Sequence, residues 1–134
     1  MSTVTEYPIP SGAGSALQII TGPDKNLWFT ENDPVSNRIG QVTPTGKTTE
    51  YGVPTFGGMP NGITVGPGND LWFTEQFGNK IGQLTTGGQF TEYPTPSTQQ
   101  LAGITEGPDG NLWFAVSLAR IIHTKCEKCS CAAA

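Results

Sequence analysis

The sequence predicts an all-β fold built from short antiparallel strands. Glycine contributes 18 and proline 11 of the 134 residues, and these turn-forming residues separate short apolar runs along the chain. Tryptophan, tyrosine and phenylalanine recur at intervals within those runs, which is typical of strands joined by tight turns. No stretch keeps the apolar period of an amphipathic helix beyond one or two turns. The length suits one modest domain.

A repeat of about 42 residues runs through the chain. The string NLWFTE at residues 26–31 returns as DLWFTE at 70–75 and as NLWFAV at 111–116. A Gly-Pro pair and the string TEY keep the same period, and the string IGQ marks the first two repeats. We divide the chain into repeats at about 5–48, 49–90 and 91–122, followed by a divergent, cysteine-containing tail at 123–134.

Each repeat predicts four short strands, which are clearest in the middle repeat. Its apolar segments lie at 61–65, 70–75, 80–84 and 89–93. Glycine, proline and asparagine between them supply the chemistry of tight turns, and Pro94 ends the last strand because it cannot donate to a ladder. Four short antiparallel strands in about 42 residues correspond to one β-propeller blade. The sequence therefore predicts three four-stranded antiparallel blades.

The two ends of the repeat array predict an incomplete propeller. Residues 3–8, TVTEYP, form an extra outer strand with no blade before it, and the third repeat lacks an outer strand. Known propellers have about four to eight blades, and exposed blade faces and strand edges favour association. We expect a half-propeller completed as a homodimer with about six blades, in which residues 3–8 are exchanged. A partner protein that supplies the missing blades, and a truncated gene product, are the alternatives.

The motif EYPxP…GIxxGPDGNLWFTE…KIGQ resembles the blade repeat of the virginiamycin B lyase family, the streptogramin lyases. The resemblance extends from Thr5 to about Ile122. It implies a seven-bladed propeller whose catalytic positions cluster at one mouth of the central channel. The implied reaction removes a proton beside an ester carbonyl and expels the ester oxygen, while Mg²⁺ steadies the enolate. The motif is more specific for the repeat than for the reaction, since fold does not fix function.

The resemblance also implies where catalytic groups would stand. One set of positions precedes the GI of each innermost strand and holds Leu17, Asn61 and Ala102. The other set ends the WFxE string and holds Glu31, Glu75 and Val116. No imidazole or phenol occupies these positions, although histidine is the usual base for such chemistry. We therefore predict no catalytic residue.

Two acids and three amides remain as candidate binding residues. Glu31 and Glu75 are candidate ligands for a hard cation such as Mg²⁺, and Asn32, Asn61 and Gln76 would add amide oxygens. Alternatively, each glutamate only ends its strand and faces solvent or caps the following loop.

The expected function is binding of a small molecule or glycan at the channel mouth, without lyase activity. One alternative is an active streptogramin B lyase that opens a cyclic depsipeptide ester with the help of Mg²⁺. Another is a lectin-like propeller, whose aromatic faces stack on sugars. Trp28, Trp72 and Trp113 lie mid-strand, which favours packing between blades over sugar binding.

Composition excludes several partners. The formal net charge is −4 and basic residues are scattered, so nucleic acid is not an expected partner. No apolar run is long enough to span a membrane, and the N-terminus lacks the pattern of a secretory signal, so we expect a cytoplasmic protein.

The tail carries the histidine and all three cysteines of the chain. His123, Cys126, Cys129 and Cys131 are ligand types that zinc accepts, though their spacing is compressed. The last four residues also read as a prenylation box at Cys131. A divergent end with neither function is the simpler interpretation.

Overall fold

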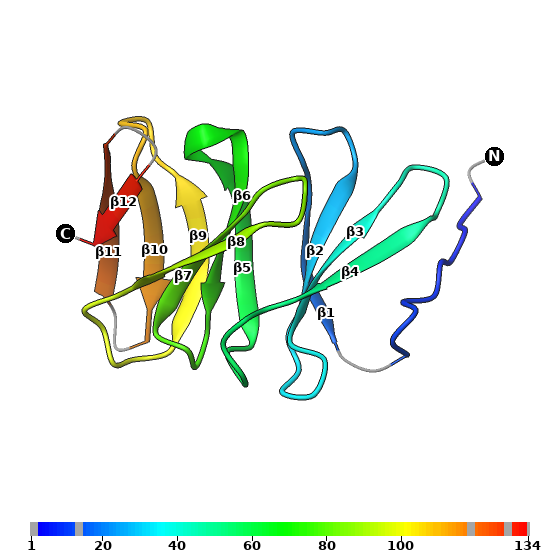
Figure 1. The fold of residues 1–134 in the computed structure, drawn as a ribbon, viewed down its shortest axis with the longest axis horizontal. Coiled ribbons are helices and arrows are strands. Elements are labelled where there is room, and N and C mark those ends of the chain that lie inside the picture. Colours follow the sequence, from blue (N-terminus) through cyan, green and yellow to red (C-terminus); the bar gives the residue numbers. More distant parts are fainter. Residues whose placement is uncertain (1–2, 13–14, 118–119, 128–129, 134) are drawn as a thin grey trace.

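The chain folds into three stacked, four-stranded antiparallel sheets, and this confirms the predicted fold class (Figure 1). The computed structural model describes residues 3–12, 15–117, 120–127 and 130–133, with side chains up to residue 124. We call the sheets the first, second and third blade.

Each blade runs from its innermost to its outermost strand in chain order. The first blade contains β1 (Ala16–Thr21), β2 (Leu27–Glu31), β3 (Arg38–Val42) and β4 (Thr48–Gly52). The second contains β5 (Pro60–Gly66), β6 (Asp70–Glu75), β7 (Lys80–Leu84) and β8 (Phe90–Pro94), with the 3₁₀ turn Pro67–Asn69 between its first two strands. The third contains β9 (Leu101–Glu106), β10 (Leu112–Val116), β11 (Arg120–Glu127) and β12 (Ser130–Ala133).

The GPD…NLW motif forms a turn in which the aspartate hydrogen-bonds the tryptophan ring. In the first blade Asp24 accepts a hydrogen bond from Trp28 Nε1 at 2.9 Å and another from the backbone N–H of Asn26 at 3.1 Å. Asp109 accepts the same bond from Trp113 Nε1 at 3.0 Å in the third blade. The carboxylate thus fixes the turn and satisfies a ring N–H that would otherwise be costly to bury.

The blades pack face to face, mainly through the second and third strands of one blade and the first and second strands of the next. Trp28 and Ile39 of the first blade are fully buried against Ile63, Leu71 and Phe73 of the second. A second cluster repeats this arrangement between the second and third blades; it contains Trp72, Ile81, Leu101, Ile104, Leu112 and Phe114. Tyrosines of the outer strands complete each contact by stacking on the tryptophan of their own blade, with 5.7 Å between ring centroids in both cases.

The predicted vacancy in the third blade is wrong, because β12 occupies the outer position. β12 pairs antiparallel with β11, in a register that places Cys126 opposite Cys131. The tail therefore adds a fourth strand to the sheet. This pairing gives hydrogen-bond partners to backbone groups at the edge of β11. The zinc and prenylation hypotheses for Cys126, Cys129 and Cys131 concern side chains outside the described residues.

The extra outer strand predicted at residues 3–8 is not paired with any described strand. The segment runs beside the first blade at one end of the row (Figure 1). The ring of Tyr7 lies against Gly46, where a Cβ atom would come within 2.1 Å of it. Among the described residues no helix is long or apolar enough to cross a bilayer.

The glycine of the IGQ motif makes room for a phenylalanine ring, and this can be tested. A Cβ at Gly82 would lie 2.0 Å from the ring of Phe73, whereas a Cβ at Gly52 would meet nothing within 4 Å. We expect Gly82→Ala to lower the free energy of unfolding by about 1–3 kcal/mol through overpacking. Gly52→Ala, the matched control, should be neutral or slightly stabilising. Urea denaturation measures both, and equal effects would contradict this role for Gly82.

Candidate functional site

Four amide side chains from adjoining blades meet at one end of the sheets, and we call them the amide cluster. Asn32 follows β2, Asn61 lies near the start of β5, Gln76 follows β6 and Gln100 precedes β9. Strand β5 begins at the end of the blades where β2 and β6 finish, because neighbouring strands within a blade are antiparallel. Three of these residues were predicted from the sequence.

Hydrogen bonds join the amides into a chain across all three blades. Asn32 Nδ2 donates to Gln76 Oε1 at 3.0 Å and to the Pro60 carbonyl at 3.0 Å. Gln76 Nε2 donates in turn to Gln100 Oε1 at 3.1 Å. Asn61 Nδ2 lies 3.5 Å from Gln76 Oε1 and 3.4 Å from the Leu101 carbonyl. The cluster is half-buried to exposed and presents neutral donors and acceptors.

Glu31 and Glu75 do not join this cluster. Both are fully buried, and none of the bonds that link the amides involves them. Glu31 faces Glu50, Arg38 and Ser11. Glu75 faces the equivalent groups of the second blade, which are Glu92, Lys80 and Thr55. The sequence did not predict that each glutamate of WFTE lies beside the glutamate of the following TEY.

The two glutamate pairs repeat one electrostatic arrangement. Burial, then the neighbouring carboxyl group, raise the pKa of Glu75 to about 8 and that of Glu31 to about 7. Two charged carboxylates could not hydrogen-bond each other, because neither would carry the proton that such a bond needs. A protonated Glu75 can donate to Glu92, whose Oε1 lies 3.8 Å from Lys80 Nζ.

This arrangement does not fit one Mg²⁺ shared by Glu31 and Glu75. Each carboxyl group sits beside its own basic side chain, with Arg38 Nη1 lying 3.9 Å from Glu50 Oε1 in the first blade. Among the described residues, no three histidine, cysteine, aspartate or glutamate side chains gather as a metal site. The metal assignment therefore stays a prediction of the sequence.

The described positions just before the GI of each innermost strand hold no general base. Leu17 is more than half exposed, Asn61 belongs to the amide cluster and Ala102 is half-buried on β9. The histidine of the chain, His123, lies on β11 and stacks on Trp113 with 4.7 Å between ring centroids. The site can therefore hold neutral polar groups, but it offers no imidazole to accept a proton.

Sequence reasoning missed Gln100, Glu50 and Glu92. Gln100 lies in a polar run outside every repeat marker, so no signal distinguished it. The two glutamates, in contrast, belong to the TEY string that recurs in the repeats. A charged residue recurring with the period of the core is a signal of a buried pair that could have been used.

Comparisons with known proteins agree on one family. The model of the virginiamycin B lyase family matches residues 1–128. A selenomethionine-substituted virginiamycin B lyase from Staphylococcus aureus is 36% identical with a TM-score of 0.89, over 98% of this chain and 45% of that one. A streptogramin B lyase structure is 38% identical with a TM-score of 0.88, over 98% and 44%.

A third similar structure is a catalytically inactive His-to-Ala variant of the Staphylococcus aureus virginiamycin B lyase with quinupristin. It is 35% identical with a TM-score of 0.86, over 98% of this chain and 44% of that one. This chain thus spans less than half the length of these relatives. Among curated protein sequences, none matches.

The raised glutamate pKa values predict a fall in stability as pH rises. From about pH 4.5 to about pH 8, the folded chain holds protons that the unfolded chain releases, so unfolding becomes easier across this range. We expect the melting temperature to fall from about pH 5 to about pH 9, and Glu75→Gln to flatten most of the fall above pH 7.

Exposed Glu106 provides the control for this experiment, because Glu106→Gln changes the same charge at the surface. Thermal melts of the three proteins in matched buffers measure the effect. A wild-type melting temperature that rises over this range, or an unchanged slope in Glu75→Gln, would contradict the proton-sharing pair.

Proposed function

Because the chain belongs to the virginiamycin B lyase family, we propose that it supplies blades to a closed propeller that binds a small polar ligand without cleaving it. The observation that carries this proposal is the amide cluster, where Asn32, Asn61, Gln76 and Gln100 present neutral hydrogen-bonding groups at one end of adjoining blades. Such groups suit the amide, ester and hydroxyl groups of a neutral compound. A cyclic peptide of the quinupristin type is the reference ligand.

The position of the histidine supports binding without catalysis. The related enzyme with quinupristin is catalytically inactive as a His-to-Ala variant. In this chain His123 stacks on Trp113 in the third strand of its blade, while the innermost strands carry Leu17, Asn61 and Ala102 at the matching positions. Elimination beside an ester carbonyl needs a base within hydrogen-bond reach of the proton. We propose that no lyase reaction occurs.

A lectin-like function receives less support. Aromatic stacking on a sugar requires an accessible ring face. Trp28 and Trp72 are fully buried between blades and Trp113 is half-buried against His123. A glycan would therefore be bound through the amides, and a neutral sugar panel is the second ligand class to test.

Self-association is the proposed route to a complete ring. Three blades leave two blade faces uncovered, and a homodimer would give about six, within the usual range. In this proposal residues 3–8 pair with the third blade of the partner copy. Since β12 already holds that outer position, exchange requires its displacement.

Substitution of the amides tests the binding proposal. We expect Asn61→Ala and Gln76→Ala each to weaken quinupristin binding about two- to tenfold, because each removes one or two hydrogen bonds. Isothermal titration calorimetry measures the dissociation constants. Gln89→Ala, an exposed amide in the turn at the opposite end of the blade, is the matched control. Absence of binding by the wild type, or equal losses in the control, would overturn the proposal.

Product analysis tests the absence of catalysis. The wild-type protein incubated with quinupristin and Mg²⁺ should leave the ring intact by mass spectrometry, since no base faces the ligand. The Staphylococcus aureus lyase serves as positive control. Ring-opened product that disappears on adding a chelator would instead establish a metal-assisted lyase.

A further inference from the structure

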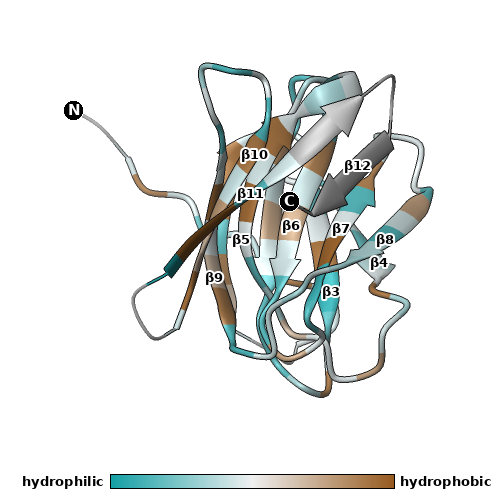
Figure 2. Cartoon of the chain, turned by 90° about the vertical axis from the view of Figure 1, so that its left-hand side faces the viewer, coloured by the Kyte–Doolittle hydropathy of each residue, from teal (hydrophilic) through white to brown (hydrophobic). Residues whose placement is uncertain are grey.

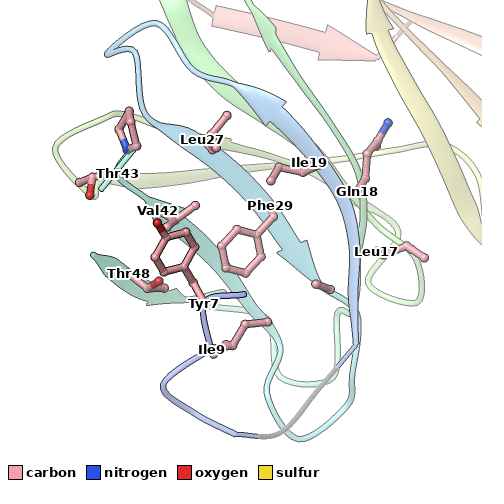
Figure 3. Close-up of a pocket in the computed structure, with 12 residues that line it drawn as sticks. Tyr7, Ile9, Leu17, Gln18, Ile19, Leu27, Phe29, Val42, Thr43 and Thr48 are labelled. Atoms are coloured by element: carbon pink, nitrogen blue, oxygen red, sulfur yellow. The ribbon is translucent and has the colours of Figure 1, made fainter. Parts of the chain in front are cut away.

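One face of the first blade is an open apolar groove. It encloses about 370 Å³ and is lined by Ile19, Leu27, Phe29 and Val42 of the blade and by Tyr7 and Ile9 of the preceding segment (Figure 3). Among the described residues, no charged side chain lines it. An uncovered surface of this kind on a blade usually marks an interaction site.

The same surface is covered in the other two blades. Ile63 of the second blade and Ile104 of the third are the repeat equivalents of Ile19, and they are 1% and 7% exposed, whereas Ile19 is 59% exposed. The covering residues belong to the preceding blade each time; before the second blade they are Trp28, Ile39, Tyr51 and Val53. The groove is therefore the uncovered counterpart of a surface that the preceding blade covers in the second and third blades.

Part of the covering set is already in place at the groove. Tyr7 and Ile9 are the repeat equivalents of Tyr51 and Val53. Tyr7 lies against Gly46 in the way that Tyr51 lies against Gly88, where added Cβ atoms would come within 2.1 and 2.8 Å of the respective rings. What the groove lacks is the tryptophan and the isoleucine that an inner pair of strands would supply.

The third blade presents those two residues on its far face. Ile121 is the repeat equivalent of Ile39 and Ile81; it is 68% exposed, whereas they are 0% and 1% exposed. Trp113 corresponds to Trp28 and Trp72, and it stacks on His123 in place of a tyrosine. Figure 2 views this face, where β11 is brown, and so hydrophobic, just beyond its hydrophilic first tip. The chain thus carries both uncovered halves of one repeated contact.

We propose that the groove of the first blade receives the far face of the third blade from a second copy, through Trp113 and Ile121. The contact is head-to-tail, so it uses two different surfaces of each copy. It rests on the proposed self-association and specifies its interface. Apolar burial drives it, since no charged side chain of the described residues lines the groove and the two residues it would receive are a tryptophan and an isoleucine.

The proposed contact lacks one hydrogen bond that the internal contacts have. Thr30 Oγ1 donates to the Asn61 carbonyl of the next blade at 2.8 Å, and Thr74 Oγ1 donates likewise to the Ala102 carbonyl. The equivalent donor position in the third blade is Ala115, and the equivalent acceptor is the Leu17 carbonyl. Ala115→Thr should therefore tighten the dimer about two- to tenfold.

Sedimentation velocity over a range of concentrations tests the interface. The wild type should dimerise, and Ile19→Glu and Ile121→Lys should each weaken the dimer at least about tenfold, because a charge would be buried unpaired. Both positions are exposed in the single chain, so the variants should fold. Phe56→Glu, at a position 96% exposed in a loop, is the matched control and should dimerise like the wild type.

Mixing the two variants distinguishes this contact from others. Ile19→Glu and Ile121→Lys together restore one native pair of surfaces, so the mixture should dimerise more tightly than either variant alone. A dimer that survives Ile19→Glu, or a mixture that stays monomeric, overturns this interface and leaves self-association itself standing. A monomeric wild type overturns both, while ligand binding is decided separately by calorimetry.

Discussion

The fold depends on one contact, the burial of a tryptophan and an isoleucine of one blade against the next blade. A four-stranded sheet with apolar side chains on both faces cannot exclude water from either face by itself. Trp28 and Ile39 become inaccessible only because the second blade covers them, and Trp72 and Ile81 only because the third does. The free energy of unfolding of such an array is approximately the sum of the stability of each blade and the energy of each contact between neighbouring blades. The end blades, with one neighbour each, are consequently where the array is weakest.

The glutamate pairs show that the repeat also carries an electrostatic device. Lys80 lies 3.8 Å from Glu92 and Arg38 lies 3.9 Å from Glu50, so each basic side chain can neutralise one charge of a pair. The remaining glutamate avoids the cost of a second buried charge by binding a proton. In the third blade Val116 replaces the glutamate of the WFTE string, so no carboxyl group has to be protonated there. Each glutamate pair therefore links the second strand of a blade to the outer strand of the same blade. Its role is structural and lies within the blade.

The repeat made the blades predictable because their strands, turns and glycines obey local rules. The hydrogen bond from Trp28 to Asp24, for example, spans four residues, and both of its partners belong to the repeated motif. The burial of Glu75 beside Glu92 was not predictable in this way, since it depends on β8, which lies two strands further along the chain in the same blade. The pairing of β12 was missed for a different reason: the tail has lost the repeat motif, yet an open strand edge accepts any chain with free backbone groups. Gln100 was missed because only the stacking of the blades brings it to Gln76.

Ring geometry separates ligand binding from assembly. The close superposition on the Staphylococcus aureus lyase means that neighbouring blades of this chain are turned as they are in that protein. The family resemblance implies seven blades, and in a seven-bladed ring each blade turns by about 51°. A six-bladed ring needs about 60°, so the proposed dimer would have to tighten its contacts or remain open by about one blade. The amide cluster does not depend on the number of blades in the ring, because Asn32, Gln76 and Gln100 all come from one chain. Closure would place a second cluster across the channel, and the blade number would then set the space between the two clusters. In the proposed function, assembly would therefore control the size of the ligand more than the presence of binding.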